Sequence, residues 1–128
     1  MKVLVDSSIL MLSAELGKNL LEMAEKELDE KLELYTLEDV VRELKAIARG
    51  KGKRSKLARV ALEIAIKFNI IECLEESSVD EKIIKVAREL NMPIVTADSE
   101  MVREAKKKNV PILIFHRDMR ITFEGWRP

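Results

Sequence analysis

Four acidic residues stand beside apolar segments of the chain instead of on an outward-facing surface. Asp6 and Asp98 each follow a short apolar run of the kind that forms a buried strand. Helical projection places Glu43 at the border of an apolar stripe, and it places Asp80 one turn before Ile83, on the inward side of a later helix. An acid in such a position is costly to bury unless it is paired or binds a cation. These acids are therefore the candidates for chemistry.

Each acid also has a structural explanation when it is considered alone. Asp6 and Asp98 stand where a side chain could cap the N-terminus of the following helix. Glu43 could be an exposed acid at the edge of its stripe, and Asp80 could be favoured by the dipole of a helix N-terminus. Glu81 has such a structural role, because it lies three residues after a serine, which is the spacing of a capping box.

Considered together, the same acids predict a site for divalent cations. The carboxyl ends of parallel strands meet at one edge of a sheet, so we expect Asp6 and Asp98 to share that edge and Glu43 and Asp80 to project toward it. Carboxylates in one cleft repel one another and raise each other's pKa values unless a cation neutralises them. Ligation by oxygen alone suits Mg²⁺ or Mn²⁺, which keep several waters and bind through few carboxylates and substrate phosphate.

A strongly basic stretch offers a second kind of chemistry. Between Leu44 and Leu62 there are seven basic residues and no acid, although the whole chain balances 23 Lys and Arg against 23 Asp and Glu. Such a local excess favours contact with phosphate, and a solvated loop between helices is the alternative. No aromatic residue lies in the stretch, so it offers no platform for stacking bases. The residues predicted to make these contacts are Arg49, Lys51, Lys53, Arg54 and Lys56.

Other motifs that could carry chemistry fail on spacing. The run Gly-Lys-Gly-Lys at 50–53 follows a helix and lacks the spacing of a Walker loop, and Ser55 replaces the third glycine of a dinucleotide fingerprint. His116 has no nucleophile placed beside it by a recognisable motif, so we expect a surface residue. Cys73 is expected to be a small buried hydrophobe. One Cys and one His exclude an internal disulfide framework and an ordinary Cys/His zinc site.

The elements that must position the acids alternate between strands and helices. Apolar runs predict strands, and apolar residues at helical spacing predict helices. The predicted strands cover residues 3–6, 31–35, 69–73, 93–97 and 111–115, and the predicted helices cover residues 8–16, 18–28, 37–48, 55–68, 79–90 and 99–108. Because parallel strands need crossover helices, the pattern predicts a three-layer α/β/α fold, in which helices cover both faces of an open, five-stranded parallel sheet.

Length and composition set the limits of this fold. With 128 residues and 47% apolar content, the chain is expected to form one domain over residues 1–128. Residues 117–128 are expected to be a loose C-terminal segment, in which residues 120–123 could add a short edge strand. No apolar run approaches the roughly 18 residues that span a bilayer, and the acid at position 6 comes too early for a signal peptide. We therefore expect a cytoplasmic protein with no membrane partner.

The order and spacing of four fragments resemble the PIN-domain nucleases over nearly the whole chain. The fragments are Val-Leu-Val-Asp-Ser-Ser at 3–8, Val-Val-Arg-Glu-Leu at 40–44, Val-Asp-Glu-Lys-Ile-Ile at 79–84 and Ile-Val-Thr-Ala-Asp at 94–98. The resemblance implies a parallel sheet in the order 3-2-1-4-5 and metal-dependent cleavage of RNA phosphodiesters. It also implies that the catalytic residues, which are the ligands of Mg²⁺ or Mn²⁺, are Asp6, Glu43, Asp80 and Asp98.

We therefore expect a metal-dependent endoribonuclease whose basic stretch binds RNA. The hydroxyls of Ser7, Ser8 and Thr96 stand next to the acids and could orient a carboxylate or a water on the metal, although helix capping explains at least one of them equally well. Ala97 departs from the family pattern, because members that process ribosomal RNA often carry Asn before the acid. This departure affects the positioning of the substrate.

Several biological roles are compatible with the resemblance. The long helix-loop-helix between residues 37 and 68 resembles archaeal members similar to ribosomal-RNA-processing endonucleases, for which a ribosome-assembly partner is expected. The VapC toxins, which would bring an antitoxin partner, are the alternative within the family, and a homodimer is compatible with either role. A third hypothesis for the function is an inactive RNA-binding assembly factor. A phosphotransfer domain fits less well, because Ser8, Cys73 and His116 occupy or neighbour positions where its patterns need other residues.

Overall fold

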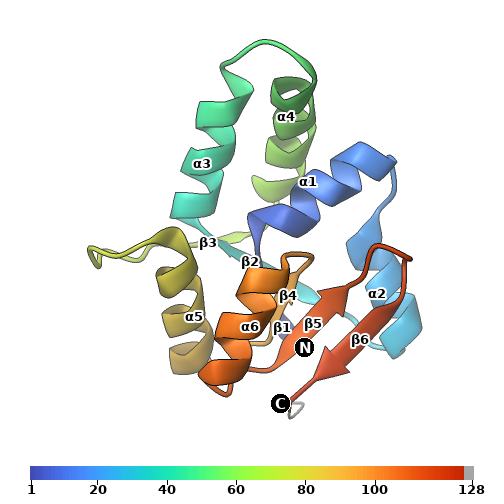
Figure 1. The fold of residues 1–128 in the computed structure, drawn as a ribbon, viewed down its shortest axis with the longest axis vertical. Coiled ribbons are helices and arrows are strands. Elements are labelled where there is room, and N and C mark those ends of the chain that lie inside the picture. The colour runs from blue at the N-terminus through green and yellow to red at the C-terminus, as the bar shows by residue number, and fades with distance from the viewer. Residues whose placement is uncertain (126–128) are drawn as a thin grey trace.

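A computed structural model describes residues 1–125 and shows one sheet with helices on both faces (Figure 1). The strands are β1 (Lys2–Val5), β2 (Glu33–Leu37), β3 (Asn69–Ile71), β4 (Ile94–Thr96), β5 (Ile112–Phe115) and β6 (Ile121–Glu124). The helices are α1 (Ser7–Leu16), α2 (Leu20–Leu28), α3 (Glu38–Ala48), α4 (Lys53–Ala65), α5 (Val79–Leu90) and α6 (Ser99–Lys107). Every predicted helix and strand forms, with ends shifted by a few residues.

The sheet has the order β3-β2-β1-β4-β5-β6, and the first five strands run parallel, as the resemblance implies. The central strand β1 is buried on both faces, and Val3, Leu4 and Val5 are 0% exposed. Helices α5 and α6 pack against each other and against β4, whereas α1 packs against α4 and also contacts β4. The end of β1, where the candidate site begins, is therefore held by the most buried part of the core.

The prediction of five strands is wrong at one edge, because the sheet has six. Strand β6 pairs antiparallel with β5, and Leu113 lies opposite Phe123. The strand is half-buried on an edge and mixes polar and apolar residues, so its sequence lacks the continuous apolar run of the inner strands. It lies within residues 117–128, which the sequence predicts to be loose, and it forms where the sequence allows a short edge strand at 120–123. Residues 126–128 fall outside the described part of the chain.

Helices α5 and α6 lead into the next strand through similar turns. Asn91 and Asn109 adopt left-handed backbone conformations, with φ of 53° and 57°, which asparagine tolerates better than most residues. The backbone N–H of the following residue then bonds back to the helix, at 2.9 Å for both Met92 and Val110. A proline follows in each case and directly precedes β4 or β5. These turns fix where β4 and β5 begin.

Helices α3 and α4 form a hairpin that projects from the end of the sheet (Figure 1). Arg59 of α4 fixes the connecting loop, because its guanidinium donates to the carbonyl oxygens of Ala48 at 3.1 Å and Gly50 at 2.9 Å. A Cβ at Gly50 would lie 2.7 Å from the Ser55 hydroxyl, so a larger residue there would require the Ser55 side chain to move. Arg59 is one of the seven basic residues between Leu44 and Leu62, and its guanidinium is occupied by hydrogen bonds within the hairpin.

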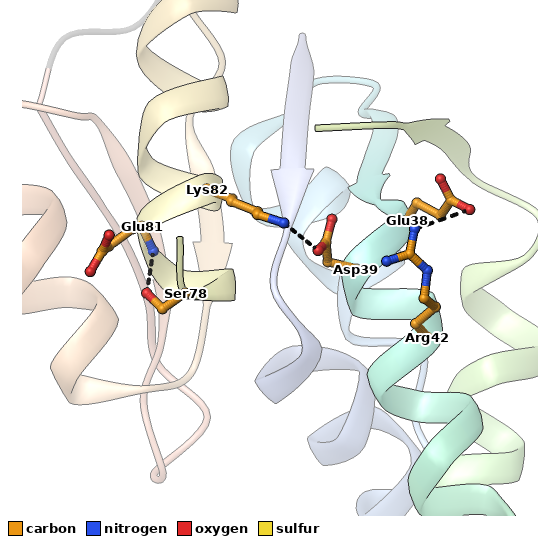
Figure 2. Close-up of polar contacts among 6 residues, drawn as sticks. All are labelled: Glu38, Asp39, Arg42, Ser78, Glu81 and Lys82. Carbon is orange, nitrogen blue, oxygen red and sulfur yellow. Dashed lines mark hydrogen bonds and ion pairs between the residues drawn. The ribbon is translucent and has the colours of Figure 1, made fainter. Parts of the chain in front are cut away.

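An ion pair connects the first turn of α3 to α5 (Figure 2). Lys82 Nζ lies 2.8 Å from Asp39 Oδ2, and the two side chains are only 12% and 11% exposed. Helical projection sets Asp39 well off the apolar stripe of its helix, and the structure shows that this acid instead meets a partner 43 residues away. Figure 2 also shows Glu38 and Arg42, a pair on the outer side of α3 that is 3.5 Å apart and well exposed.

We expect Lys82→Met to lower the free energy of unfolding by about 2 kcal/mol, because it leaves Asp39 largely buried without its counter-charge. The matched control Arg42→Met removes a cation from an exposed pair and should cost less than about 0.5 kcal/mol. The double variant Asp39→Leu/Lys82→Met should recover most of the loss, since apolar residues can replace both charges. Urea unfolding measures all three. Equal losses for the two single variants would show that the ion pair does not stabilise the α3–α5 contact.

Candidate active site

Asp6 is the most buried of the four predicted acids, at 5% exposed, and directly follows the central strand. Its Oδ2 accepts hydrogen bonds from Ser8 Oγ and from Thr96 Oγ1, both at 2.9 Å, and the two hydroxyl oxygens lie 3.1 Å apart. Although Asp6 stands at the N-cap position of α1, its side chain makes no capping hydrogen bond. The capping alternative therefore does not explain why an acid is buried here.

The two hydroxyl groups also hold the turn between β4 and α6. Ser8 Oγ accepts from the backbone N–H of Ala97, and Thr96 Oγ1 accepts from the backbone N–H of Asp98, each at 3.0 Å. Each hydroxyl thus donates to the carboxylate at the end of β1 and accepts from the chain that follows β4. These bonds set the position of Asp98 relative to Asp6.

Asp98 caps α6, as the structural alternative predicts, because its Oδ1 accepts from the backbone N–H of Glu100 at 3.0 Å. The side chain is half-buried, and its charge also acts on Asp6 and Asp80. Capping engages one of the two carboxylate oxygens. An N-cap aspartate can therefore still contribute charge to a neighbouring site.

Asp80 lies in the first turn of α5, which is capped by Ser78 as the capping-box spacing predicts: the backbone N–H of Glu81 donates to Ser78 Oγ at 3.2 Å (Figure 2). Although the residue is exposed overall, partial burial of its carboxyl group raises the pKa of Asp80 above the ordinary range. The charges of Asp6, Asp98 and Glu100 raise it further. Helical projection points Glu100 away from the apolar stripe, so the sequence does not reveal this contribution.

Burial is also the main cause that raises the pKa of Asp6. The hydroxyls of Thr96 and Ser8 and a backbone hydrogen bond at Ser7 act in the opposite direction, and the charge of Asp98 adds to the increase. The structure thus brings three of the predicted acids, Asp6, Asp80 and Asp98, into electrostatic contact.

Glu43 reaches the same region by a different route. It is exposed on α3, and its Oε1 accepts a hydrogen bond from Ser7 Oγ at 3.1 Å. Its charge is not among the causes that shift the pKa of Asp6 or Asp80. The Ser7 hydroxyl therefore connects Glu43 to the end of β1. Glu43 lies outside the group formed by the other three acids.

We refer to Asp6, Glu43, Asp80 and Asp98 together as the acidic edge. Within residues 1–125, none of these carboxylates forms an ion pair with a lysine or arginine. The cations on the adjoining helices are engaged elsewhere, Lys82 by Asp39 and Arg42 by Glu38. The described lysines and arginines thus leave the negative charge of the acidic edge unpaired.

The donor set restricts the kind of cation that could bind. In the part of the chain that the structure describes, no three His, Cys, Asp or Glu side chains are grouped closely enough to hold a metal ion by themselves. An all-protein cage is therefore absent from this region. The arrangement fits Mg²⁺ or Mn²⁺, because such ions keep several waters and bind through one or two carboxylates together with substrate phosphates.

The predicted phosphate contacts lie at the tip of the α3–α4 hairpin, where all five side chains are exposed. We call this set the basic loop, and it consists of Arg49, Lys51, Lys53, Arg54 and Lys56. Among the described residues, none of these cations has an acidic partner within 4.0 Å. The loop is therefore an uncompensated positive surface on the helix that carries Glu43.

The remaining singled-out residues have simpler surroundings. His116 is half-buried, and its Nε2 lies 2.8 Å from Thr122 Oγ1 of β6. Cys73 is half-buried rather than enclosed in the core. Across the described residues, no helix combines the length and apolar character needed to cross a bilayer.

Comparisons with known proteins place this geometry in a family. Ribonuclease VapC9 from Archaeoglobus fulgidus is 31% identical over 86 residues, which cover 66% of this chain and 62% of that protein. The chain thus matches about three-fifths of that relative's length.

Two solved structures share the fold. The structure of the PIN domain endonuclease Utp24 superposes with a TM-score of 0.78 at 21% identity, covering 98% of this chain and 92% of that one. A domain of a functionally unknown protein from Methanocaldococcus jannaschii gives a TM-score of 0.66 at 18% identity, covering 99% and 96%. The family model described as PIN like domain matches residues 3–118, which include the whole acidic edge and the basic loop. The protein therefore belongs to the PIN-like domain family.

Proposed function

We propose that this protein is an endoribonuclease that depends on Mg²⁺ or Mn²⁺ and cuts RNA at the acidic edge. The observation that carries the proposal is the uncompensated charge at the ends of β1 and β4. Asp6 and Asp80 have raised pKa values because burial and neighbouring carboxylates act on both, and no described lysine or arginine pairs with either. Such an arrangement is unfavourable for the protein alone and favourable once a dication is bound.

Asp6 and Asp98 are the proposed direct ligands, because the Ser8 and Thr96 hydroxyls hold them at adjacent strand ends. Asp80 adds charge from α5, and Glu43, held by Ser7, contributes through water. A bound dication would supply Lewis-acid stabilisation of the phosphoryl oxygens and lower the pKa of a coordinated water. The protein's own residues orient the carboxylates, and the described lysines and arginines do not pair with them. Neither a serine nor a histidine nucleophile is required.

The basic loop is the proposed RNA-binding surface. Arg49 lies six residues after Glu43 on the same hairpin, a rise of about 9 Å along a helix, so one RNA strand could reach both. When the lysines and arginines of the loop contact RNA phosphates, counter-ions bound to the RNA would be released. The affinity for RNA should therefore fall as the salt concentration rises. The name of the matched relative, a ribonuclease, supports RNA over DNA as the substrate.

The biological role forms a separate part of the proposal. A role in ribosomal-RNA processing, with a ribosome-assembly partner, is the first candidate because of the long α3–α4 hairpin. A toxin role with an antitoxin partner is the second, and the 31% identity to ribonuclease VapC9 favours it. A homodimer is compatible with both roles.

We expect Asp6→Asn and Asp98→Asn each to reduce Mn²⁺-dependent cleavage of a structured RNA by about 100-fold or more, because each removes a proposed ligand charge. Asparagine retains the ability of Asp98 to cap α6, so the fold should remain intact. Glu104→Gln is the matched control, since it changes an exposed acid of α6 and should leave the rate unchanged. Gel analysis of RNA cutting with Mn²⁺ or with chelator measures this. RNA binding without any chelator-sensitive cutting by the unmodified protein would instead identify an inactive RNA-binding factor.

We also expect Asp6→Asn to raise the melting temperature in chelator at about pH 7, because the folded protein no longer has to bury a charge. The pKa of Asp6 is raised in the folded state, so the stability linked to this group is complete below its ordinary value of 3.8 and is lost as the pH rises through the folded-state pKa. The advantage of the variant should therefore grow from about pH 4 to about pH 7.

Addition of Mn²⁺ should reverse this order. At about 100 times the dissociation constant, the ion should stabilise the unmodified protein by about 2.7 kcal/mol and the variant much less. Thermal unfolding followed by circular dichroism measures both effects. Equal stabilisation of the two proteins by Mn²⁺ would remove Asp6 from the metal site.

The triple variant Lys51→Ala/Lys53→Ala/Arg54→Ala should lower the slope of log affinity for single-stranded RNA against log salt by about 2, because three phosphate contacts are lost. The matched control replaces three exposed lysines without a described acidic partner elsewhere, Lys18, Lys31 and Lys67. Fluorescence anisotropy over a salt series measures the slopes. An unchanged slope for the loop variant, or an equal change in the control, would show that the loop does not contact RNA.

A further inference from the structure

A groove opens beside the acidic edge, between α1 and the turn that joins β5 to β6, and encloses about 570 Å³. None of the four carboxylates of the acidic edge lines it. Its apolar lining comes from Met11 and Leu12 of α1, Phe115 of β5 and Met119 of the turn, and His116 adds a planar polar ring. The elements involved lie near one another in Figure 1, above the end of the sheet. A hollow of this size is within the range of natural ligand sites.

The groove is continuous with the candidate active site. Ser8 and Ala97 line it, and these two residues belong to the hydrogen-bond network that holds Asp6. His116 and Arg117 also line a second hollow of about 430 Å³, which includes Asp98. A ligand in the groove would therefore lie directly beside a phosphate held at the acidic edge.

The lining has the chemistry of a nucleobase site. Phe115 is 4% exposed and forms an apolar floor, whereas His116 is half-buried and held by Thr122 at 2.8 Å. Arg117 is exposed at the same place, and no acid among the described residues lies within 4.0 Å of it. Single-stranded RNA is commonly recognised by stacking unpaired bases on His or aromatic rings or on Arg guanidinium planes.

We propose that this groove binds the base of one unpaired RNA nucleotide next to the scissile phosphate, with His116 stacking on the base and Arg117 contacting the adjoining phosphate. The proposal rests on the proposed ribonuclease function for the position of the scissile phosphate. The basic loop carries no aromatic residue, so it can hold the backbone but offers no platform on which a base can stack. The groove supplies that stacking contact, so that cleavage depends on an unpaired base at this position.

Methionine methyl groups provide a direct test of occupancy. With ¹³C-methyl methionine, a short single-stranded RNA added in chelator should shift the NMR signals of Met11 and Met119 through the ring current of the base. Met92 and Met101 are 2% and 1% exposed in the core and serve as internal references. Ribose 5-phosphate, which lacks a base, should leave all four signals in place. Unmoved groove signals with bound RNA, equal shifts with ribose 5-phosphate, or equal shifts of the core signals would each overturn the proposal.

Variants at the groove test the stacking itself. His116→Ala should weaken binding of the oligonucleotide in chelator by about 10-fold. It should also remove the difference between that oligonucleotide and one with a single abasic nucleotide. His116→Phe keeps a planar ring, so it should retain most of the affinity and controls for the lost bond to Thr122. Arg117→Ala should weaken both oligonucleotides equally. Additive effects of His116→Ala and the abasic nucleotide would overturn the stacking.

These measurements separate failure of the groove from failure of the proposed nuclease, because they need no metal and no cutting. If cutting is sensitive to chelator but the Met11 and Met119 signals do not move, the base-binding role of the groove is wrong and the proposed nuclease function stands. Shifted methionine signals without cutting under any divalent ion would leave a nucleotide-binding groove and overturn the nuclease.

Discussion

The candidate site depends on one unfavourable interaction: negative charge is buried at the end of the central strand, and no lysine or arginine within residues 1–125 forms an ion pair with it. Asp6 can be held there because Val3, Leu4 and Val5 of β1 are fully buried and because the Ser8 and Thr96 hydroxyls donate to its carboxylate. Two neutral donors orient a carboxylate without cancelling its charge, whereas a lysine in their place would do both. The fold thus tolerates repulsion among Asp6, Asp80 and Asp98, and the free energy stored in that repulsion becomes available to a ligand cation.

Positive charge is plentiful in the surroundings, and its distribution follows the same constraint. Lys82 and Arg42 approach the helices of the acidic edge but are engaged by Asp39 and Glu38, and Arg59 is engaged by backbone carbonyls. The Asp39–Lys82 pair connects α3, which carries Glu43, to α5, which carries Asp80, so it helps to fix the relative positions of these two helices. Five cations without a described acidic partner lie together on the basic loop. A chain with no net charge therefore presents separate negative and positive surfaces, which suits a polyanion that must meet a dication.

The regular part of this structure was accessible from the sequence, and the parts that were missed share a physical cause. Helix periods and apolar runs identify the helices and inner strands, because those patterns reflect burial within one element. β6 is predicted only as an optional edge strand outside the five-stranded sheet, because a half-buried edge strand needs no continuous apolar run. The Asp39–Lys82 pair, the effect of Glu100 on Asp80 and the groove at His116 each join elements far apart in the chain, and no local pattern encodes them. The placement of the acids was predictable only because the carboxyl ends of parallel strands share an edge.

Asp98 shows why the structural and functional explanations of such residues should not be set against each other. Its Oδ1 caps α6, which the sequence predicts as the ordinary role of an acid at that position. Capping fixes the side chain at the helix N-terminus, and the same restraint keeps its charge beside Asp6 and Asp80. A capped carboxylate is thus more ordered than a free surface acid, and it loses less conformational freedom when a ligand binds. What distinguishes a site acid from a purely structural one is therefore the absence of a counter-charge, which only the assembled fold reveals.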